Sequence, residues 1–101
     1  MDLKKFRWSR VYESSEEELQ DYLDGKGLEA ERWAAEEFHD FGGQTFNHDT
    51  TIFCAEGGLV FEIDNQKISL QPGDALHIPA NYAFAAVAGM TGCVCYEVTH
   101  H

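Results

Sequence analysis

The sequence contains no apolar run that approaches the ~20 residues needed to cross a membrane as a helix. The first ten residues, MDLKKFRWSR, have no apolar stretch after their basic side chains. They therefore do not follow the pattern of a signal peptide, which needs such a stretch. We expect a cytoplasmic protein that does not bind a membrane.

Basic residues are scarce. Seven Lys and Arg stand against 18 Asp and Glu, which gives a formal net charge of −11 at pH 7. A surface of this kind repels phosphate backbones and anionic lipid head groups, so nucleic acid and membranes are not expected as partners. The acidic residues are concentrated in residues 13–40, where they indicate a solvated face that keeps the protein soluble.

Cysteine is also scarce. Cys54, Cys93 and Cys95 are the three in the chain, which suits a reducing compartment. The spacing of Cys93 and Cys95 is too short for most zinc sites, and there is no second pair. Because residues i and i+2 of a strand share a face, we expect two small buried side chains there. A reactive Cys54 would lack an assignable base.

The residues that are present are sufficient for one packed core. The chain has 101 residues, of which 44% are apolar and 13% aromatic, and this length allows one domain rather than two. We assign residues 1–101 to a single domain. Within it, we expect residues 1–27 to form an N-terminal arm and a helix, and residues 28–99 to form a β-barrel.

Residues 15–24 have the pattern of one short amphipathic helix. Ser14 can cap the free amides of its first turn, and Glu17 completes a capping box. The sequence DGKG at 24–27 ends the helix. Residues 7–12, which precede it, are expected to form a leading strand or an extended arm.

After the helix the apolar pattern changes to a period of two, which is typical of strands. About eight strands after the helix, spaced by roughly ten residues, predict an antiparallel sandwich or barrel. The expected strands cover 28–38, 50–63, 67–70, 75–80, 82–88 and 93–100, and the expected turns cover 64–66, 71–74 and 89–92.

Two motifs carry a resemblance to a known family. The first is CAEGGLVFEI at 54–63, and the second is SLQPGDALHIPA at 69–80, with the Pro-Gly-Asp turn at 72–74. With this spacing, the segment 42–84 resembles a small single-domain cupin. The resemblance implies an all-β fold, an antiparallel jelly-roll β-barrel, preceded here by one short N-terminal α-helix.

The resemblance also implies a metal site, and the sequence departs from it. The family pattern supplies two histidines near residues 45–48, a glutamate near Thr50 or Thr51, and a third histidine at the position of Phe84. Of these places, only His48 carries a metal ligand. Since a metal ion needs several donor atoms around one point, we expect no cofactor and a degenerate metal site.

The alternative is that a divalent metal remains, bound by His48 and relocated ligands. The side chains that could take part are His39, Asp40, Asp49, Cys54 and His77. For His77, we expect the outer sheet or a subunit interface if its neighbour Ile78 is in the core.

Aromatic residues at the ligand positions predict an aromatic barrel mouth, suited to a small apolar or aromatic ligand. The alternative is that the rings fill the barrel and leave no cavity. The ring candidates are Phe46, Phe84, Phe53, Trp33 and Tyr82. The candidate polar groups of the pocket are His48, Thr51 and Cys54.

Three functions are compatible with these observations. We favour a non-enzymatic barrel that binds or senses a small molecule without the usual metal. A metal-dependent enzyme of the dioxygenase or isomerase type, using His48, is the alternative. A structural protein acting through its dimer interface is the third. The resemblance implies a homodimer, in which Phe6 and Trp8 form a docking arm or, alternatively, cover one end of their own barrel.

Overall fold

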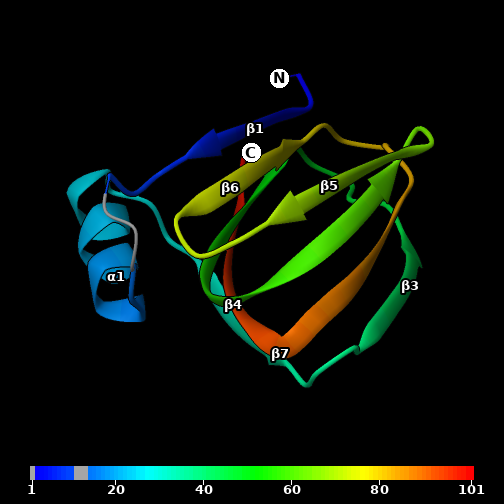
Figure 1. Ribbon diagram of the computed structural model, residues 1–101. Helices are drawn as coiled ribbons and strands as arrows, with labels where there is room; N and C mark the ends of the chain where they lie inside the picture. The colour runs from blue at the N-terminus through cyan, green and yellow to red at the C-terminus, as the bar shows by residue number, and fades with distance from the viewer. Residues whose placement is uncertain (1, 11–13) are drawn as a thin grey trace.

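The computed structural model describes residues 2–10 and 14–101 (Figure 1). Along the chain the elements are β1 (Lys4–Arg7), α1 (Glu16–Gly25), β2 (Glu31–Ala35), β3 (Asp40–Gln44), β4 (Thr50–Ile63), β5 (Gln66–Leu70), β6 (Asp74–Ile78) and β7 (Phe84–Thr99). All the strand pairs between these elements are antiparallel. The predicted fold class, a mainly β antiparallel fold with one short N-terminal helix, is confirmed.

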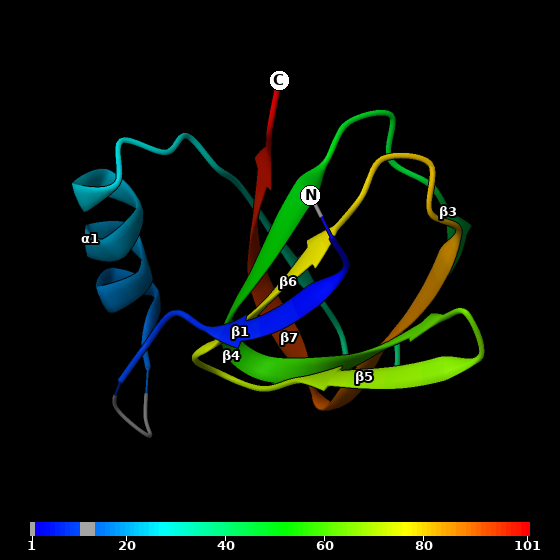
Figure 2. The ribbon, with the colours of Figure 1, turned by 90° about the horizontal axis from the view of Figure 1, so that it is seen from above.

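The two longest strands, β4 and β7, each take part in both layers of the barrel. The first half of β4 pairs with β6 and with the second half of β7, whereas its second half pairs with β5 and the first half of β7. Strands β1 and β2 extend the first layer, and β3 extends the second. The layers curve around one interior, as in a jelly roll (Figures 1 and 2).

Side chains change faces midway along both long strands. In β4, Ile52 and Cys54 contribute to the interior cluster before the bend, whereas Leu59 and Phe61 contribute after it. The switch from even to odd numbers follows two irregularities in the pairing with β7, between positions 54 and 56 and between 57 and 59. A bulge adds a residue to one strand and so shifts the period-two pattern.

Glycines make the bend between the layers, and the turn predicted at 89–92 is wrong. Strand β7 continues through this segment from Phe84 to Thr99. Gly57 and Gly92 have φ of 70° and 73°, and a Cβ on Gly57 would collide with the carbonyl oxygen of Gly92. Only glycine accepts both a positive φ and such a close approach of another backbone. The glycines therefore let the chain bend without leaving the sheet, and the two strands expected at 82–88 and 93–100 are one bent strand. The described residues form seven strands, and they include β3, which was not predicted.

The helix is confirmed, but its cap is Ser15 rather than Ser14. Ser15 has extended backbone angles, and its Oγ accepts a hydrogen bond from the Glu18 amide at 3.2 Å. The capping residue is thus one position later than expected. Leu19 and Leu23 are buried and pack with residues of β4 and β7 on the outer side of the first layer.

The N-terminal arm packs against its own barrel. Strand β1 pairs with β6, so the strand predicted at 7–12 lies earlier than expected, and residues 11–13 fall outside the described part of the chain. The Phe6 ring lies 6.1 Å from that of Phe53. Trp8 is buried, and its indole N–H donates to the Cys54 carbonyl at 3.1 Å. Phe6 and Trp8 therefore cover their own barrel, and the homodimer stays a prediction.

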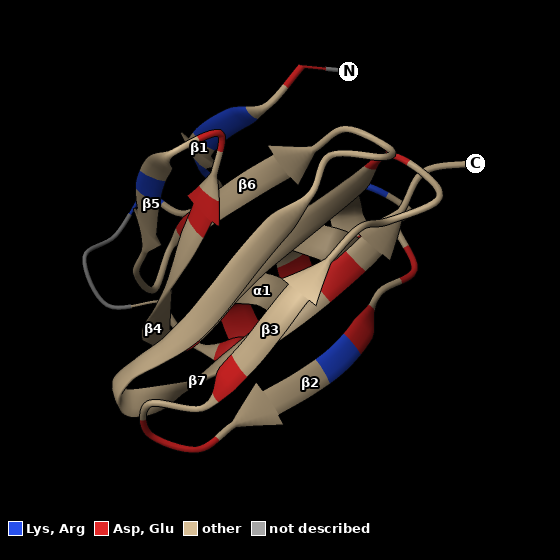
Figure 3. Ribbon diagram, turned by 90° about the vertical axis from the view of Figure 1, so that its right-hand side faces the viewer, with Lys and Arg blue, Asp and Glu red and all other residues tan. Residues whose placement is uncertain are grey.

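Charge is distributed unevenly over the fold (Figure 3). Asp and Glu are frequent on α1 and around β2 and β3, whereas Lys residues lie on β1 and β5. Among the described residues, no helix has the length and apolar content that a membrane span requires.

Candidate functional site

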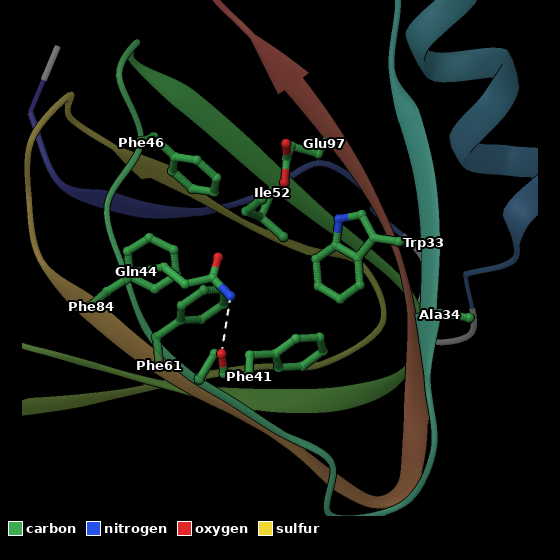
Figure 4. Close-up of a pocket in the computed structure, with 10 residues that line it drawn as sticks. Trp33, Ala34, Phe41, Gln44, Phe46, Ile52, Phe61, Phe84 and Glu97 are labelled. Atoms are coloured by element: carbon green, nitrogen blue, oxygen red, sulfur yellow. Dashed lines mark hydrogen bonds between the residues drawn. The ribbon is translucent and has the colours of Figure 1, made fainter.

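A pocket of about 240 Å³ lies inside the barrel (Figure 4). Elements from both layers contribute to it. Its lining residues are Trp33 and Ala34 from β2, Phe41 and Gln44 from β3, Phe46 from the following loop, Ile52 and Phe61 from β4, and Phe84, Ala86 and Glu97 from β7. The curvature of the barrel thus brings together residues that are far apart in the sequence.

The wall of the pocket is mainly aromatic. Phe84 is central to one side, with its ring centroid 5.1 Å from that of Phe46 and 5.8 Å from that of Phe61. On the other side, Trp33 and Phe41 meet edge to face at 5.2 Å. These are the separations at which aromatic pairs attract each other, so the rings hold one another around the cavity rather than filling it.

Polar groups gather at one end of the pocket. Among the ten lining residues, Glu97 has the one ionisable side chain. Burial raises the pKa of the Glu97 carboxyl, and repulsion from Glu31, its partner across β2 and β7, raises the pKa further. The Trp33 indole N–H faces this carboxylate (Figure 4) and opposes the rise. This N–H is buried but makes no hydrogen bond of standard geometry within the described part of the chain.

Gln44 adds a second polar group. Its side-chain nitrogen donates to the Phe41 carbonyl at 3.1 Å. Gln44 lines the pocket but is itself an exposed residue. The pocket therefore presents a donor from Trp33, an acceptor from Glu97 and the amide of Gln44 within an apolar surround.

Of the six pocket candidates from the sequence, Phe46 and Phe84 are among the lining residues and the other four are not. His48 is exposed, with its ring 5.0 Å from that of His101. Tyr82 is 40% exposed. Cys54 faces the interior but is fully buried within the core cluster.

Thr51 lies on the opposite face of β4 from the pocket. Its hydroxyl is 2.5 Å from His77 Nδ1 and 2.8 Å from His100 Nε2. The neighbouring Phe53, another ring candidate, packs in the outer cluster under α1. Their position follows from strand alternation, because Ile52 between them faces the interior.

His77 and Ile78 point to opposite faces, as alternation predicts. Ile78 is fully buried in the interior cluster, whereas His77 is on the outer sheet, with its ring 4.6 Å from that of Phe6. Burial lowers the pKa of His77, and nearby His100 and Lys4 lower it further. The neutral imidazole therefore suits its place beside β1, where it contacts the Phe6 ring.

The three cysteines are free and buried, and they face the interior. Cys54 and Cys95 are partners across β4 and β7. Hydrogen bonds with Cys54 and Cys93 raise the pKa of the Cys95 thiol, and burial raises it further. Cys95 therefore stays a neutral thiol, which makes it a poor nucleophile.

The donor atoms near the pocket do not fit a bound metal ion. In the described ranges, no group of three or more His, Cys, Asp or Glu side chains could hold one. The proposed replacements are dispersed: His39 packs edge to face on Phe41 at 4.7 Å, and an Asp49 oxygen accepts from the Ala80 amide at 2.8 Å. A protein metal site needs several donors that converge, and Glu97 alone does not supply them.

Sequence reasoning named Trp33, Phe46 and Phe84 but missed the other seven lining residues, among them Phe41, Gln44 and Glu97. A signal for Glu97 was present, because it follows Cys93 and Cys95 at a spacing of two on one strand and so shares their interior face. Phe41 and Gln44 gave no such signal. They lie on the strand β3, which two glycines interrupt and which therefore lacks a clear strand pattern.

Similarity to other sequences is local. No protein-family model matches the chain. A stretch of 34 residues is 50% identical to quercetin 2,3-dioxygenase of Bacillus subtilis, and this covers 34% of the chain and 10% of the dioxygenase. The match therefore spans a small part of that enzyme's length.

Solved structures resemble the whole fold. A cupin superfamily protein from Desulfitobacterium hafniense superposes with a TM-score of 0.65 at 18% identity, over 97% of this chain and 76% of that one. A DUF861 family protein from Thermotoga maritima superposes with a TM-score of 0.64 at 13% identity, over 98% of this chain and 100% of that one. A cupin-2 domain containing protein from Shewanella frigidimarina superposes with a TM-score of 0.64 at 15% identity, over 97% of this chain and 80% of that one. The chain is thus a small protein with the cupin fold.

Proposed function

We propose that this barrel binds a small apolar or aromatic molecule in the pocket between its layers and works as a binding or sensing module without a resident metal ion. The observation that carries the proposal is the aromatic lining itself. Phe46 and Phe84, which stand at or near places where the family resemblance implies metal ligands, instead form the wall of a cavity. Apolar pockets with a few convergent polar groups are the usual form of small-molecule sites.

The volume of the pocket sets the size of the ligand. It measures about 240 Å³, whereas a dry apolar cavity of about 150 Å³ is large enough for benzene. One aromatic ring with a small substituent therefore fits, and a larger ligand would require the loop that carries Phe46 to move.

A metal-dependent dioxygenase or isomerase is the alternative, and the local similarity to a dioxygenase favours it. The arrangement of donors argues against it. His48 is exposed and does not line the pocket, and Glu97 would need partners that no lining residue provides. An enzyme of this kind would have to bind its metal outside the pocket described above.

The test is an NMR titration of ¹⁵N-labelled protein with toluene. The two tryptophans give two indole N–H signals: Trp33 lines the pocket, and Trp8 lies in the outer cluster. We expect the Trp33 signal to shift in a saturable manner and the Trp8 signal to stay in place.

Two substitutions on β7 complete this test. Ala86→Leu should abolish the shift because the larger side chain fills the pocket, into which Ala86 faces. Val87→Leu is the matched control, since Val87 is the next residue and is 39% exposed. If toluene shifts neither indole signal, or shifts both alike in all three proteins, the pocket is not a binding site and the proposal fails.

A further inference from the structure

The charged groups around the pocket are of one sign. Glu97 is at its polar end and Glu31 is the cross-strand neighbour of Glu97, while none of the ten lining residues is Lys or Arg. Arg32 is the basic residue between Glu31 and Trp33 in the sequence. It points to the outside, where its guanidinium donates to the Glu16 carboxylate at 2.5 Å. The acidic end of the pocket is therefore not neutralised by a residue of its own lining.

We propose that the pocket selects a small organic cation, an ammonium group attached to an aromatic ring, with the ammonium at Glu97 and the ring between the phenylalanines. This rests on the proposed function and adds the class of ligand to it. A carboxylate next to several ring faces is the arrangement by which proteins recognise alkylated or aromatic ammonium ions.

The aromatic wall supports a cation directly. Trp33 and Phe46 lie on either side of Glu97 (Figure 4), and Phe41 packs edge to face on Trp33 farther along the pocket. The negative face of an aromatic ring attracts a cation within about 6 Å, most strongly for Trp, and the attraction is greater where water is excluded. A neutral ligand would gain the apolar contacts but not this attraction.

The same surroundings oppose an anion. A carboxylate ligand would meet Glu97 and Glu31 with no basic side chain in the lining, in a protein whose formal net charge is −11. Like charges in a partly buried site repel strongly, since the local dielectric constant is low. The pocket therefore discriminates by charge as well as by shape.

The Trp33 indole, which lacks a standard hydrogen bond, gives a further reason to expect a cation beside Glu97. Its N–H is buried without a standard hydrogen bond and faces the Glu97 carboxyl, and a buried donor of this kind is costly. A cation beside Glu97 favours the ionised carboxylate, which is a stronger acceptor for this N–H. The ligand would thus strengthen the contact between the Trp33 indole and Glu97.

Binding should also depend on pH, because only ionised Glu97 attracts the cation. The titratable groups near it are Glu31 on β2 and, along the groove that Glu97 also borders, Glu29, His100 and His101. The pocket residues that β4 and β3 contribute are Ile52, Phe61, Phe41 and Gln44, none of which titrates. The affinity for an ammonium ion should therefore rise with pH as Glu97 loses its proton.

Three probes of one shape test the inference: benzylammonium, benzyl alcohol and benzoate. Each is titrated into the same protein and followed by the Trp33 indole signal, with Trp8 as the internal reference. We expect benzylammonium to bind at least tenfold more tightly than benzyl alcohol, and benzoate to bind most weakly. Glu97→Gln should remove the preference, so that benzylammonium binds no more tightly than benzyl alcohol to this variant. Glu62→Gln is the matched control, since Glu62 is an exposed carboxylate on β4 outside the pocket.

The outcomes separate this inference from the proposed function. If benzylammonium and benzyl alcohol bind equally, or if the preference persists in Glu97→Gln, the cation inference is overturned and the pocket remains a neutral apolar site. If none of the probes binds while the protein is folded, the proposed function fails, and the inference fails with it.

Discussion

The two tryptophans of this protein have opposite environments, and so do the two faces of the layer between them. Trp8 is on the outer face, where its indole N–H donates to the Cys54 carbonyl at 3.1 Å. Trp33 is on the inner face, where its N–H is buried with no standard hydrogen bond in the described part of the chain. The fold itself thus satisfies the Trp8 indole, whereas it leaves the Trp33 indole without a standard partner.

The same difference extends along β4 and β7. Their outer side chains pack with those of α1 and with Phe6 and Trp8. Tyr96 on this face donates to Glu16 at 2.9 Å and accepts from Gln20 at 2.8 Å. Their inner side chains meet a cavity that ends at Glu97. One set of strands thus supplies stability on one face and a site on the other, and the two roles should respond differently to substitution.

The largest effect should come from the outer face. Leu19→Ala removes a fully buried side chain from the outer cluster and is expected to lower the free energy of unfolding by about 2–5 kcal/mol, measured by chemical denaturation. Phe46→Ala, at the half-buried edge of the pocket, is expected to cost less and to weaken toluene binding. Equal losses from the two substitutions would contradict the division between the faces.

Substitution at the bend that joins the layers should lower the stability nearly as much as substitution in the outer cluster. Gly57→Ala introduces a side chain at positive φ and against the Gly92 carbonyl, and we expect a loss of at least about 2 kcal/mol. Gly42 also has φ of 70°, but a Cβ there meets nothing within 4 Å. Gly42→Ala should therefore show the conformational cost alone, about 1 kcal/mol. If thermal unfolding shows the two variants to be alike, the close approach at the bend does not matter.

The two tryptophans offer the most direct comparison. Trp8→Phe should lower the free energy of unfolding by about 1–2 kcal/mol, since it removes a buried hydrogen bond together with part of a packed ring. Trp33→Phe should be close to neutral, because its N–H has no standard partner to lose. Denaturation of both variants in one buffer gives the difference, and a larger loss at Trp33 would show that its N–H is satisfied in the folded protein.

The smallest effect concerns pH and Glu97. The pKa of Glu97 is raised in the folded protein, so its contribution to stability is fully present below the unfolded pKa of about 4.3 and is lost as pH rises through the higher folded pKa. Glu97→Gln does not titrate, and it should gain stability relative to the parent between about pH 4 and pH 7. Thermal unfolding of the parent and of Glu97→Gln at about pH 4 and pH 7 measures this gain. If the difference in stability between the two proteins is the same at both pH values, the pKa of Glu97 is not raised.

Particular residues show how much of the fold could be predicted from the sequence. The turn at 72–74 was predictable because proline and glycine impose their own backbone angles, and Gly73 does adopt φ of 97°. The alternation at His77 and Ile78 was predictable for a similar local reason. The bend at Gly92 was not, since a glycine that approaches another backbone and a glycine in a turn look the same in a sequence.

The pocket was only partly predictable for a physical reason. Bulges shift the alternation between the halves of β4 and β7, so a face assigned in one half does not carry over to the other. Phe46 and Phe84 could be named from the resemblance, and Glu97 from its spacing of two after Cys95, whereas Phe41 and Gln44 became pocket residues only through the curvature that brings β3 against the interior.

The central claim is that the inner end of the barrel takes an organic molecule and not a metal ion. The most direct test is elemental analysis of untagged protein purified without chelator, with His48→Ala analysed in parallel. The account predicts far less than one equivalent of any transition metal per chain, and the same amount in the variant. Near-stoichiometric metal that disappears in His48→Ala would contradict the account and restore the metal-dependent enzyme.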